Sequence, residues 1–324
     1  MIDARRLYFT DPCEVEVRSV TLDAPEEGEV VVETAESGIS PGSELLVYRG
    51  EFPEETAVDE TIEALAGTFE YPLPYGYAAV GTVTDCGAGV DESWRGRTVF
   101  AFEPHADRFV ASTDTLVPLR EGITPTEATL LPSVETATNL VLDGNPRVGE
   151  EVVVFGAGLV GLCTVHVLSQ FPLSNLTVVE PVATRRRLAA QFGADRAIAP
   201  AAVGSDAAPS AVDMVYELSG QPATLDDAIE TVGYDGRVVV GSWYGKKRAP
   251  INLGGSFHRE RISLESSQVS TIDPDLRGRW DRERRFDVAF DHLQTLDTER
   301  LCGEAFAFDA AADAYRTLAD GTVK

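Results

Sequence analysis

A glycine-rich turn between an apolar strand and an apolar helix constrains this chain more than any other feature of its sequence. The stretch VVVFGAGLVGLCTVHVL places Gly156, Gly158 and Gly161 where the strand ends and the helix begins. In this setting the first glycine permits a tight turn, the second lets the backbone approach a pyrophosphate, and the third lets helix and strand pack closely. Free N–H groups at the helix start then bind the phosphate charge. The pattern predicts the opening βαβ unit of a Rossmann dinucleotide-binding domain.

The residues after this turn bear on the choice of cofactor. The next expected strand ends in Glu180, 24 residues after Gly156. Its carboxylate can accept hydrogen bonds from the adenosine ribose hydroxyls and would repel a 2′-phosphate, so NAD is favoured. Arg185, Arg186 and Arg187 follow at once, and one of them could attract a 2′-phosphate, so NADP stays possible. We expect the cofactor to be bound by Gly156, Gly158, Leu159, Val160, Gly161, Glu180, Arg185, Ser219 and Gly241.

The pattern of apolar residues divides the chain into a β-rich part and an α/β part. Short strands rich in Val and Thr are expected at 14–20, 28–35, 78–85 and 97–102, followed by helical spacing over 126–142. Beyond residue 149, strands alternate with helices, which predicts a parallel sheet. Strands are expected at 151–155, 176–180, 196–199, 213–218, 237–241 and 262–266, with helices at 159–169, 183–192 and 223–232. The end of the chain is expected to form a helix at 284–296, a strand at 305–308 and a helix at 310–318.

The charge of the chain limits its partners and its setting. The formal net charge is −26, and only three of the 27 basic residues are lysine. This imbalance indicates adaptation to high salt, where ions screen repulsion between surface carboxylates, although ordinary bacterial acidity is the alternative. Nucleic acid is not an expected partner. The N-terminus lacks a basic-then-apolar signal, and no apolar run approaches the roughly 20 residues that span a bilayer, so a cytoplasmic protein without membrane contact is expected.

Motifs along nearly the whole chain resemble the medium-chain dehydrogenase/reductase family. The supporting stretches are LDAPEEGEVVVETAESGIS, GYAAVGTV, LLPSVETATNLV, VVVFGAGLVG, QFGAD, GRVVVGSW and FAFDAAADAYRTL, in the order of the family. The resemblance implies a GroES-like β-rich catalytic domain over 1–125, a Rossmann domain over 126–272 and a C-terminal segment, 273–324, that returns to the catalytic domain. It also implies a homodimer in which the Rossmann sheet continues across a two-fold axis through the strand at 262–266.

The family's zinc ligands are replaced in this sequence. In zinc-dependent members a cysteine follows the Gly-Ile of the first motif, and a His-Glu pair follows a glycine of the later strand. Here Ser40 stands at the cysteine, Tyr77 and Ala78 stand at the His-Glu pair, and LPSVE covers the last ligand region. Zinc prefers thiolate and imidazole ligands, so the resemblance implies a member without zinc. The four cysteines are far apart and predict neither a structural zinc site nor a disulfide framework.

Among zinc-free branches, SGISPGSELLVYRGEFP, YPLPYGYAAVG and SQVSTIDPDLRGRWDRERR resemble the bacteriochlorophyllide hydroxyethyl dehydrogenase group most. The resemblance implies hydride transfer between nicotinamide and an alcohol or carbonyl substrate. Quinone or enoyl reduction is one alternative. The other is a nucleotide-binding sensor that lost catalysis with its metal ligands.

Without zinc, other groups must stabilise the substrate oxygen and move its proton. The candidates are the Tyr77 phenol and the Ser40 hydroxyl, with Glu44, Tyr48 or Glu135 as the proton acceptor. The alternative for Tyr77 is a ring that only shapes the substrate pocket. No functional site is predicted at His105 or His292, and His166 is expected to be a core histidine.

A basic segment interrupts the acidic chain. Residues 246–285 hold ten basic and six acidic side chains, a local charge of +4. The segment is either a set of solvated salt bridges or a surface near Arg279 that attracts an anionic substrate.

Overall fold

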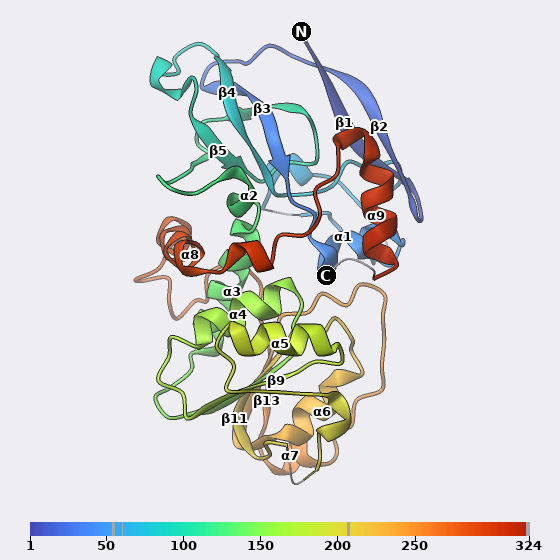
Figure 1. Ribbon diagram of the computed structural model, residues 1–324, viewed down its shortest axis with the longest axis vertical. Helices are drawn as coiled ribbons and strands as arrows, with labels where there is room; N and C mark the ends of the chain where they lie inside the picture. The colour runs from blue at the N-terminus through green and yellow to red at the C-terminus, as the bar shows by residue number, and fades with distance from the viewer. Residues whose placement is uncertain (54–55, 60, 206–207, 322–324) are drawn as a thin grey trace. The chain divides into compact units, whose positions relative to one another are not determined.

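The computed structural model describes residues 1–53, 56–59, 61–205 and 208–321. The chain forms two compact units, which we call the β-rich unit (Met1–Pro132 with Leu301–Lys324) and the parallel-sheet unit (Ser133–Arg300). Both are drawn in Figure 1. The division lies later than the boundaries expected at 125/126 and 272/273. The helix at 282–295, which carries Arg285, belongs to the parallel-sheet unit, because Arg285 hydrogen bonds to Glu135 and Asn139 there.

The β-rich unit contains antiparallel strands. A hairpin is formed by β1 (Ile2–Asp11) and β2 (Glu14–Leu22). A second sheet has the order β6-β3-β4-β5-β7 and is built from β3 (Glu29–Ser37), β4 (Ala79–Cys86), β5 (Thr98–Ala101), β6 (Arg108–Ser112) and β7 (Val117–Pro118). Inward-facing Val32, Val83, Val99 and Phe109 form its core, as expected from the alternation of apolar residues.

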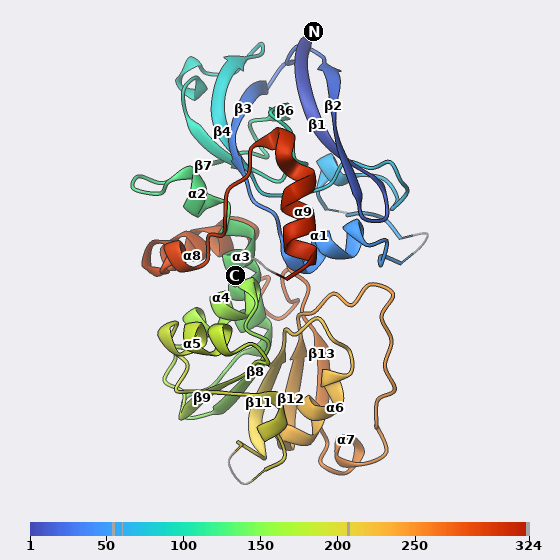
Figure 2. The same cartoon turned by 45° about the vertical axis from the view of Figure 1, so that its right-hand side comes forward.

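Three α-helices complete the β-rich unit in the part of the chain that is described: α1 (Pro41–Tyr48), α2 (Pro125–Ala128) and α9 (Ala311–Ala319). Helix α9 lies beside β2 and α1 (Figures 1 and 2). The strand expected at 305–308 is wrong, because no neighbouring strand pairs with these residues and a 3₁₀ turn begins at Phe308. The helical pattern at 126–142 is divided between α2 and α3 (Leu131–Gly144), since Pro132 is tolerated only in the first turn of a helix.

The parallel-sheet unit confirms the expected Rossmann architecture. Its described strands form one parallel sheet of order β10-β9-β8-β11-β12-β13. They are β8 (Glu151–Phe155), β9 (Asn175–Val179), β10 (Arg196–Ile198), β11 (Val212–Glu217), β12 (Val232–Val240) and β13 (Ser263–Ser266). The helices besides α3 are α4 (Leu159–Leu168), α5 (Ala183–Gln191), α6 (Thr224–Thr231), α7 (Ser256–Arg259) and α8 (Arg282–Thr295).

The two faces of this sheet are both covered. Helices α4 and α5 lie on one face and α6 on the other (Figure 2). Covering both faces makes β8 a continuous apolar run, and Val152, Val153 and Val154 are completely buried. The chain runs outward from β8 through β9 to β10 and then returns to β11, so the strand order reverses between β8 and β11. Ligands of such sheets bind at this reversal, beyond the carboxyl ends of the strands.

Candidate active site

The three glycines of the turn after β8 have the geometry that a pyrophosphate site needs. Gly156 has a φ of +101°, and a Cβ there would lie 2.6 Å from the Leu218 carbonyl oxygen. A Cβ on Gly161 would lie 2.2 Å from the Gly156 carbonyl oxygen, so this residue allows close packing of the helix on the turn. A Cβ on Gly158, the N-cap of α4, would meet nothing within 4 Å. The backbone at Gly158 is therefore open to a phosphate group, and the turn fits a dinucleotide.

Glu180, directly after β9, is fixed against this turn. Its side chain is only 3% exposed, and its two carboxylate oxygens accept hydrogen bonds from the backbone N–H groups of Ala157 and Val182, both at 2.8 Å. Arg186 donates from Nη1 to the carbonyl oxygens of Glu180 (2.6 Å) and Pro181 (2.7 Å). This nitrogen of Arg186 is engaged by the backbone, so Arg185 and Arg187 stay the candidates for contact with a 2′-phosphate.

The remaining predicted cofactor residues lie at the same end of the sheet. Leu159 and Val160 form the first turn of α4, and Ser219 follows β11. Gly241 follows β12, but a Cβ there would lie 2.6 Å from methyl groups of Leu140 and Leu218. The missing side chain of Gly241 therefore makes room for these leucines.

Tyr77 and Ser40 come together in the β-rich unit. Burial and the nearby charge of Glu44 raise the pKa of Tyr77 to about 12, while hydrogen bonds with Ser40 and Ser43 oppose this shift. The phenol is therefore neutral at neutral pH and can act as a hydrogen-bond donor. Ser43, in the first turn of α1, was not singled out from the sequence.

Glu44 is the centre of a buried polar network. Its carboxylate is completely buried and accepts hydrogen bonds from the Ser40 backbone N–H (2.7 Å) and from the Tyr315 hydroxyl. The Nε2 atom of His105 lies 2.9 Å from the carboxylate, and its Nδ1 atom lies 2.5 Å from Ser37 Oγ. A hydroxyl that donates to Nδ1 leaves Nε2–H to donate to Glu44. This network holds Glu44 in place near Tyr77.

Sequence reasoning missed His105 and Tyr315, because 61 and 271 residues separate them from Glu44. One local signal exists. Gly76 has a φ of +111°, and a Cβ there would lie 2.5 Å from the His105 ring. The glycine before Tyr77 therefore makes room for the imidazole.

Glu103, just after β5, is a second titratable group that sequence reasoning missed. Burial raises the pKa of its carboxyl to about 7, and the charge of Arg6 opposes this rise. The side chain therefore exchanges its proton near neutral pH.

Glu135 lies on α3 in the parallel-sheet unit. Its carboxylate accepts hydrogen bonds from Arg285 Nε (3.1 Å) and Nη2 (2.7 Å), and both side chains are buried. Burial raises the pKa of Glu135, and the charge of Arg285 opposes that rise. This ion pair joins α3 to α8 and favours a structural role for Glu135.

The positions that carry zinc ligands in relatives do not offer a suitable donor set. They hold a serine hydroxyl at Ser40, a phenol of raised pKa at Tyr77 and a buried methyl group at Ala78. Zinc sites in proteins use thiolate, imidazole and carboxylate donors. Among the described residues, no three His, Cys, Asp or Glu side chains form a group that could hold a metal ion. Ser40, Tyr77 and Ala78 therefore offer none of the donors that zinc prefers.

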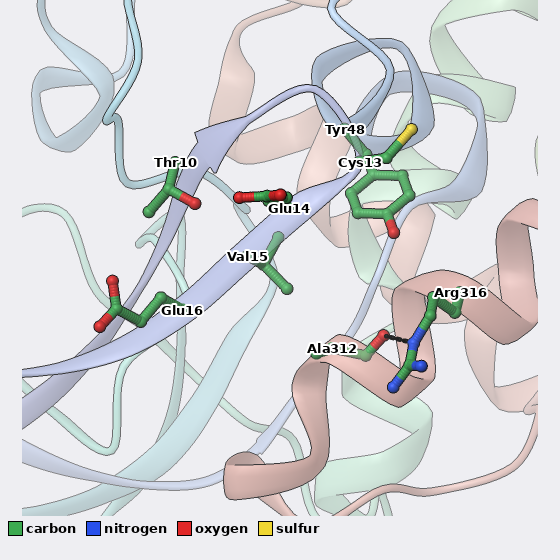
Figure 3. A pocket seen from close by; sticks show the side chains of 8 residues that line it. All are labelled: Thr10, Cys13, Glu14, Val15, Glu16, Tyr48, Ala312 and Arg316. Atoms are coloured by element: carbon green, nitrogen blue, oxygen red, sulfur yellow. Dashed lines mark hydrogen bonds between the residues drawn. The ribbon is translucent and has the colours of Figure 1, made fainter.

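A pocket of about 340 Å³ opens on the β-rich unit at the β1–β2 hairpin (Figure 3). It is lined by Thr10, Cys13, Glu14, Val15, Glu16, Tyr48, Ala312 and Arg316. Of the site residues predicted from the sequence, Tyr48 lines it and the others do not.

The basic segment 246–285 is partly engaged within the protein. Arg285 is buried against Glu135, Lys247 donates to the Gly220 carbonyl oxygen, and the Arg284 guanidinium lies 4.3 Å from the centre of the Trp280 ring. Arg279 is exposed.

Several known proteins are similar to this chain in sequence. Residues 160–290 match the zinc-binding dehydrogenase family. D-guloside 3-dehydrogenase of Escherichia coli K12 is 25% identical over 259 residues, which cover 76% of this chain and 73% of that protein. The 2-desacetyl-2-hydroxyethyl bacteriochlorophyllide A dehydrogenase of Cereibacter sphaeroides is 28% identical over 255 residues, 74% of this chain and 73% of that protein.

Solved structures share the fold. One is described as a short chain alcohol dehydrogenase (rspB) of E. coli CFT073 in complex with NADH. It superimposes with a TM-score of 0.79 at 19% identity, over 98% of this chain and 96% of that chain. In the part of the chain that is described here, no helix is long and apolar enough to cross a membrane. Residues 160–290 are thus similar to zinc-binding dehydrogenases, the relatives named above are dehydrogenases, and the chain shares the fold of the solved structure.

Proposed function

We propose that this protein transfers a hydride between a nicotinamide dinucleotide, preferably NAD, and an alcohol or carbonyl substrate, without catalytic zinc. The observation that carries the proposal is the turn after β8. Gly158 is open at the start of α4, and the Glu180 carboxylate is fixed beside this turn. Relatives named as dehydrogenases of sugar derivatives and of a bacteriochlorophyllide support an alcohol or carbonyl substrate. We further propose a cytoplasmic homodimer adapted to high salt.

Different residues of the chain have different roles in the proposed reaction. A bound nicotinamide supplies or accepts the hydride. The backbone at Gly158 and the first turn of α4 would hold the pyrophosphate, and Glu180 would bind the adenosine ribose. In carbonyl reduction, negative charge grows on the substrate oxygen. The neutral Tyr77 hydroxyl donates a hydrogen bond and then a proton to that oxygen, and its hydrogen bonds with Ser40 and Ser43 stabilise the resulting phenolate.

Tyr77→Phe tests this role, because it keeps the ring and removes the donor. We expect kcat to fall on the order of a hundredfold or more while the Kd for NADH is unchanged. Tyr8→Phe is the matched control, since this ring packs with Arg18 near the surface. If Tyr77→Phe instead changes mainly KM, the ring only shapes the pocket. The activity is found with a cofactor-linked screen of alcohols, sugars, quinones and anionic carbonyl compounds in molar potassium chloride.

The zinc-free proposal has its own measurement. Metal analysis of the purified protein should give well under one zinc per chain, and chelators should leave the activity unchanged. Stoichiometric zinc whose removal abolishes activity contradicts the proposal. The substrate screen also tests the anionic-substrate hypothesis for the segment around Arg279, since Arg279→Ala should then raise KM for anionic substrates only.

A further inference from the structure

A buried carboxylate ends β11, the strand at the reversal of strand order. Glu217 is completely buried, and its Oε1 atom accepts hydrogen bonds from the Ser219 backbone N–H (2.9 Å) and from the Ser219 hydroxyl. Its Oε2 atom accepts a hydrogen bond from the Tyr244 hydroxyl at 2.5 Å. A buried charge that lacks such donors would be strongly unfavourable. These described donors come from two separate loops, so the carboxylate joins the loops that follow β11 and β12.

Further hydrogen bonds tie the same two loops together. The Gly220 backbone N–H donates to Ser242 Oγ (2.9 Å), and Ser242 Oγ donates to the Glu217 carbonyl oxygen (3.3 Å). Lys247 Nζ donates to the Gly220 carbonyl oxygen (3.1 Å). Segments 218–221 and 241–247 therefore form one connected structure with Glu217 at its centre, which we call the Glu217 clamp.

The sheet topology indicates which part of the cofactor lies over the Glu217 clamp. Dinucleotide sites consist of two mononucleotide halves on either side of the strand reversal. Glu180 follows β9 and therefore marks the adenosine half on the β8–β10 side. The nicotinamide half then lies on the side of β11 and β12. The clamp also contacts the glycine-rich turn, because a Cβ on Gly156 would lie 2.9 Å from the Cα of Ser219.

We propose that Glu217 and Tyr244 are positioning residues for the nicotinamide half of the cofactor. They act through Ser219 and Gly220, whose backbone they fix at the carboxyl end of β11. The inference rests on the proposed function, because it assumes a nicotinamide dinucleotide. It goes beyond that function by assigning the two halves of the cofactor to separate sets of residues.

The proposal predicts that changes in the Glu217 clamp weaken binding of the nicotinamide half of the cofactor and leave binding of the adenosine half unchanged. Tyr244→Phe keeps the ring but leaves one oxygen of a buried carboxylate without its donor. A hydrogen bond to a charged group stabilises a structure enough to change a binding constant by roughly tenfold. The adenosine half depends on Glu180 and Gly158, which the substitution does not touch.

The experiment measures the Kd values of NADH and of AMP for the wild-type protein and for Tyr244→Phe, Glu217→Gln and Tyr234→Phe. Tyr234 lies on β12 and is 69% exposed, so Tyr234→Phe is the matched control. For Tyr244→Phe and Glu217→Gln we expect the Kd of NADH to rise about tenfold, with the Kd of AMP unchanged. The KM for NADH should rise by a similar factor, while kcat at saturating NADH changes less. Tyr234→Phe should leave both Kd values unchanged.

A general loss of structure predicts a different result. Equal weakening of AMP and NADH, or no change for either ligand, would overturn the inference. If Glu217→Gln does not fold, Ser219→Ala removes a donor from the same carboxylate and should show the same selective defect. Failure of the wild-type protein to bind NADH and NADPH while it binds AMP would overturn the proposed function, and the inference with it. Wild-type binding of NADH without a selective defect in the variants overturns the inference alone.

Discussion

At the residue scale, the Glu180 carboxylate can accept hydrogen bonds from the backbone and from a cofactor at the same time. Two backbone N–H groups fix both of its oxygens, yet each carboxylate oxygen has a second lone pair that can accept from a ribose hydroxyl. The same charge opposes a 2′-phosphate. Under the proposed function, a preference for NAD would depend on Glu180, while Arg185 or Arg187 would favour NADP.

Glu180→Ala tests this assignment. We expect the wild-type protein to bind NADH more tightly than NADPH, and the variant to reduce that difference by about tenfold, because it loses a hydrogen-bond acceptor and a repulsive charge. Fluorescence titration with both cofactors measures the difference, with Arg196→Ala, at an exposed arginine of β10, as the control. Equal affinities of the wild-type protein for NADH and NADPH would count against Glu180 as the selector.

At the element scale, a pair of histidines joins α4 to α8. The rings of His166 and His292 are 6.0 Å apart, and Gln170 Nε2 lies 3.2 Å from His292 Nδ1. His166 is thus a partly buried residue at a helix contact and not the core histidine expected from the sequence. Burial lowers the pKa of both histidines, and for His166 the charge of His292 adds to this effect.

This pair predicts acid sensitivity. Because the folded-state pKa values lie below the unfolded value near 6.5, the unfolded protein binds more protons, so stability falls as the pH drops below about 6.5. His292→Gln should flatten the decrease in the free energy of unfolding between pH 7.5 and pH 5.5, measured by urea denaturation. His258→Gln, at an exposed histidine of α7, is the control. Parallel curves for His292→Gln and the wild type would contradict the prediction.

A second feature at the element scale is the exposed edge of the parallel sheet, which is formed by β13. All four residues of β13 are exposed, and within the described ranges the strand pairs only with β12. An uncovered edge strand is a template for pairing, which supports the proposed dimer. Light scattering in high salt should give twice the mass of the chain. Leu264→Pro removes a backbone donor from this edge and should give monomers, whereas a wild-type protein that is only monomeric would refute the dimer.

At the scale of the whole molecule, the net charge of −26 is the dominant feature. The Debye length is about 10 Å at 0.1 M salt and about 3 Å at 1 M, so only the higher concentration screens neighbouring surface carboxylates from one another. We expect the Tm to rise by several degrees between 0.1 M and 2 M potassium chloride. Chloride is chosen because sulfate strengthens apolar burial on its own. A Tm that does not depend on salt would show that repulsion between carboxylates does not limit stability.

The sequence by itself determined the features that depend on neighbours along the chain. The glycine turn, the acid after the next strand and the alternation of strands with helices are encoded at short spacing, so they could be predicted. The tertiary structure decided which distant side chains hydrogen bond to each buried carboxylate. It placed His105 and Tyr315 on Glu44, Arg285 on Glu135, and Tyr244 on Glu217. Each of these contacts forms only when packing brings separate elements together, and the local pattern around each residue does not specify its partner.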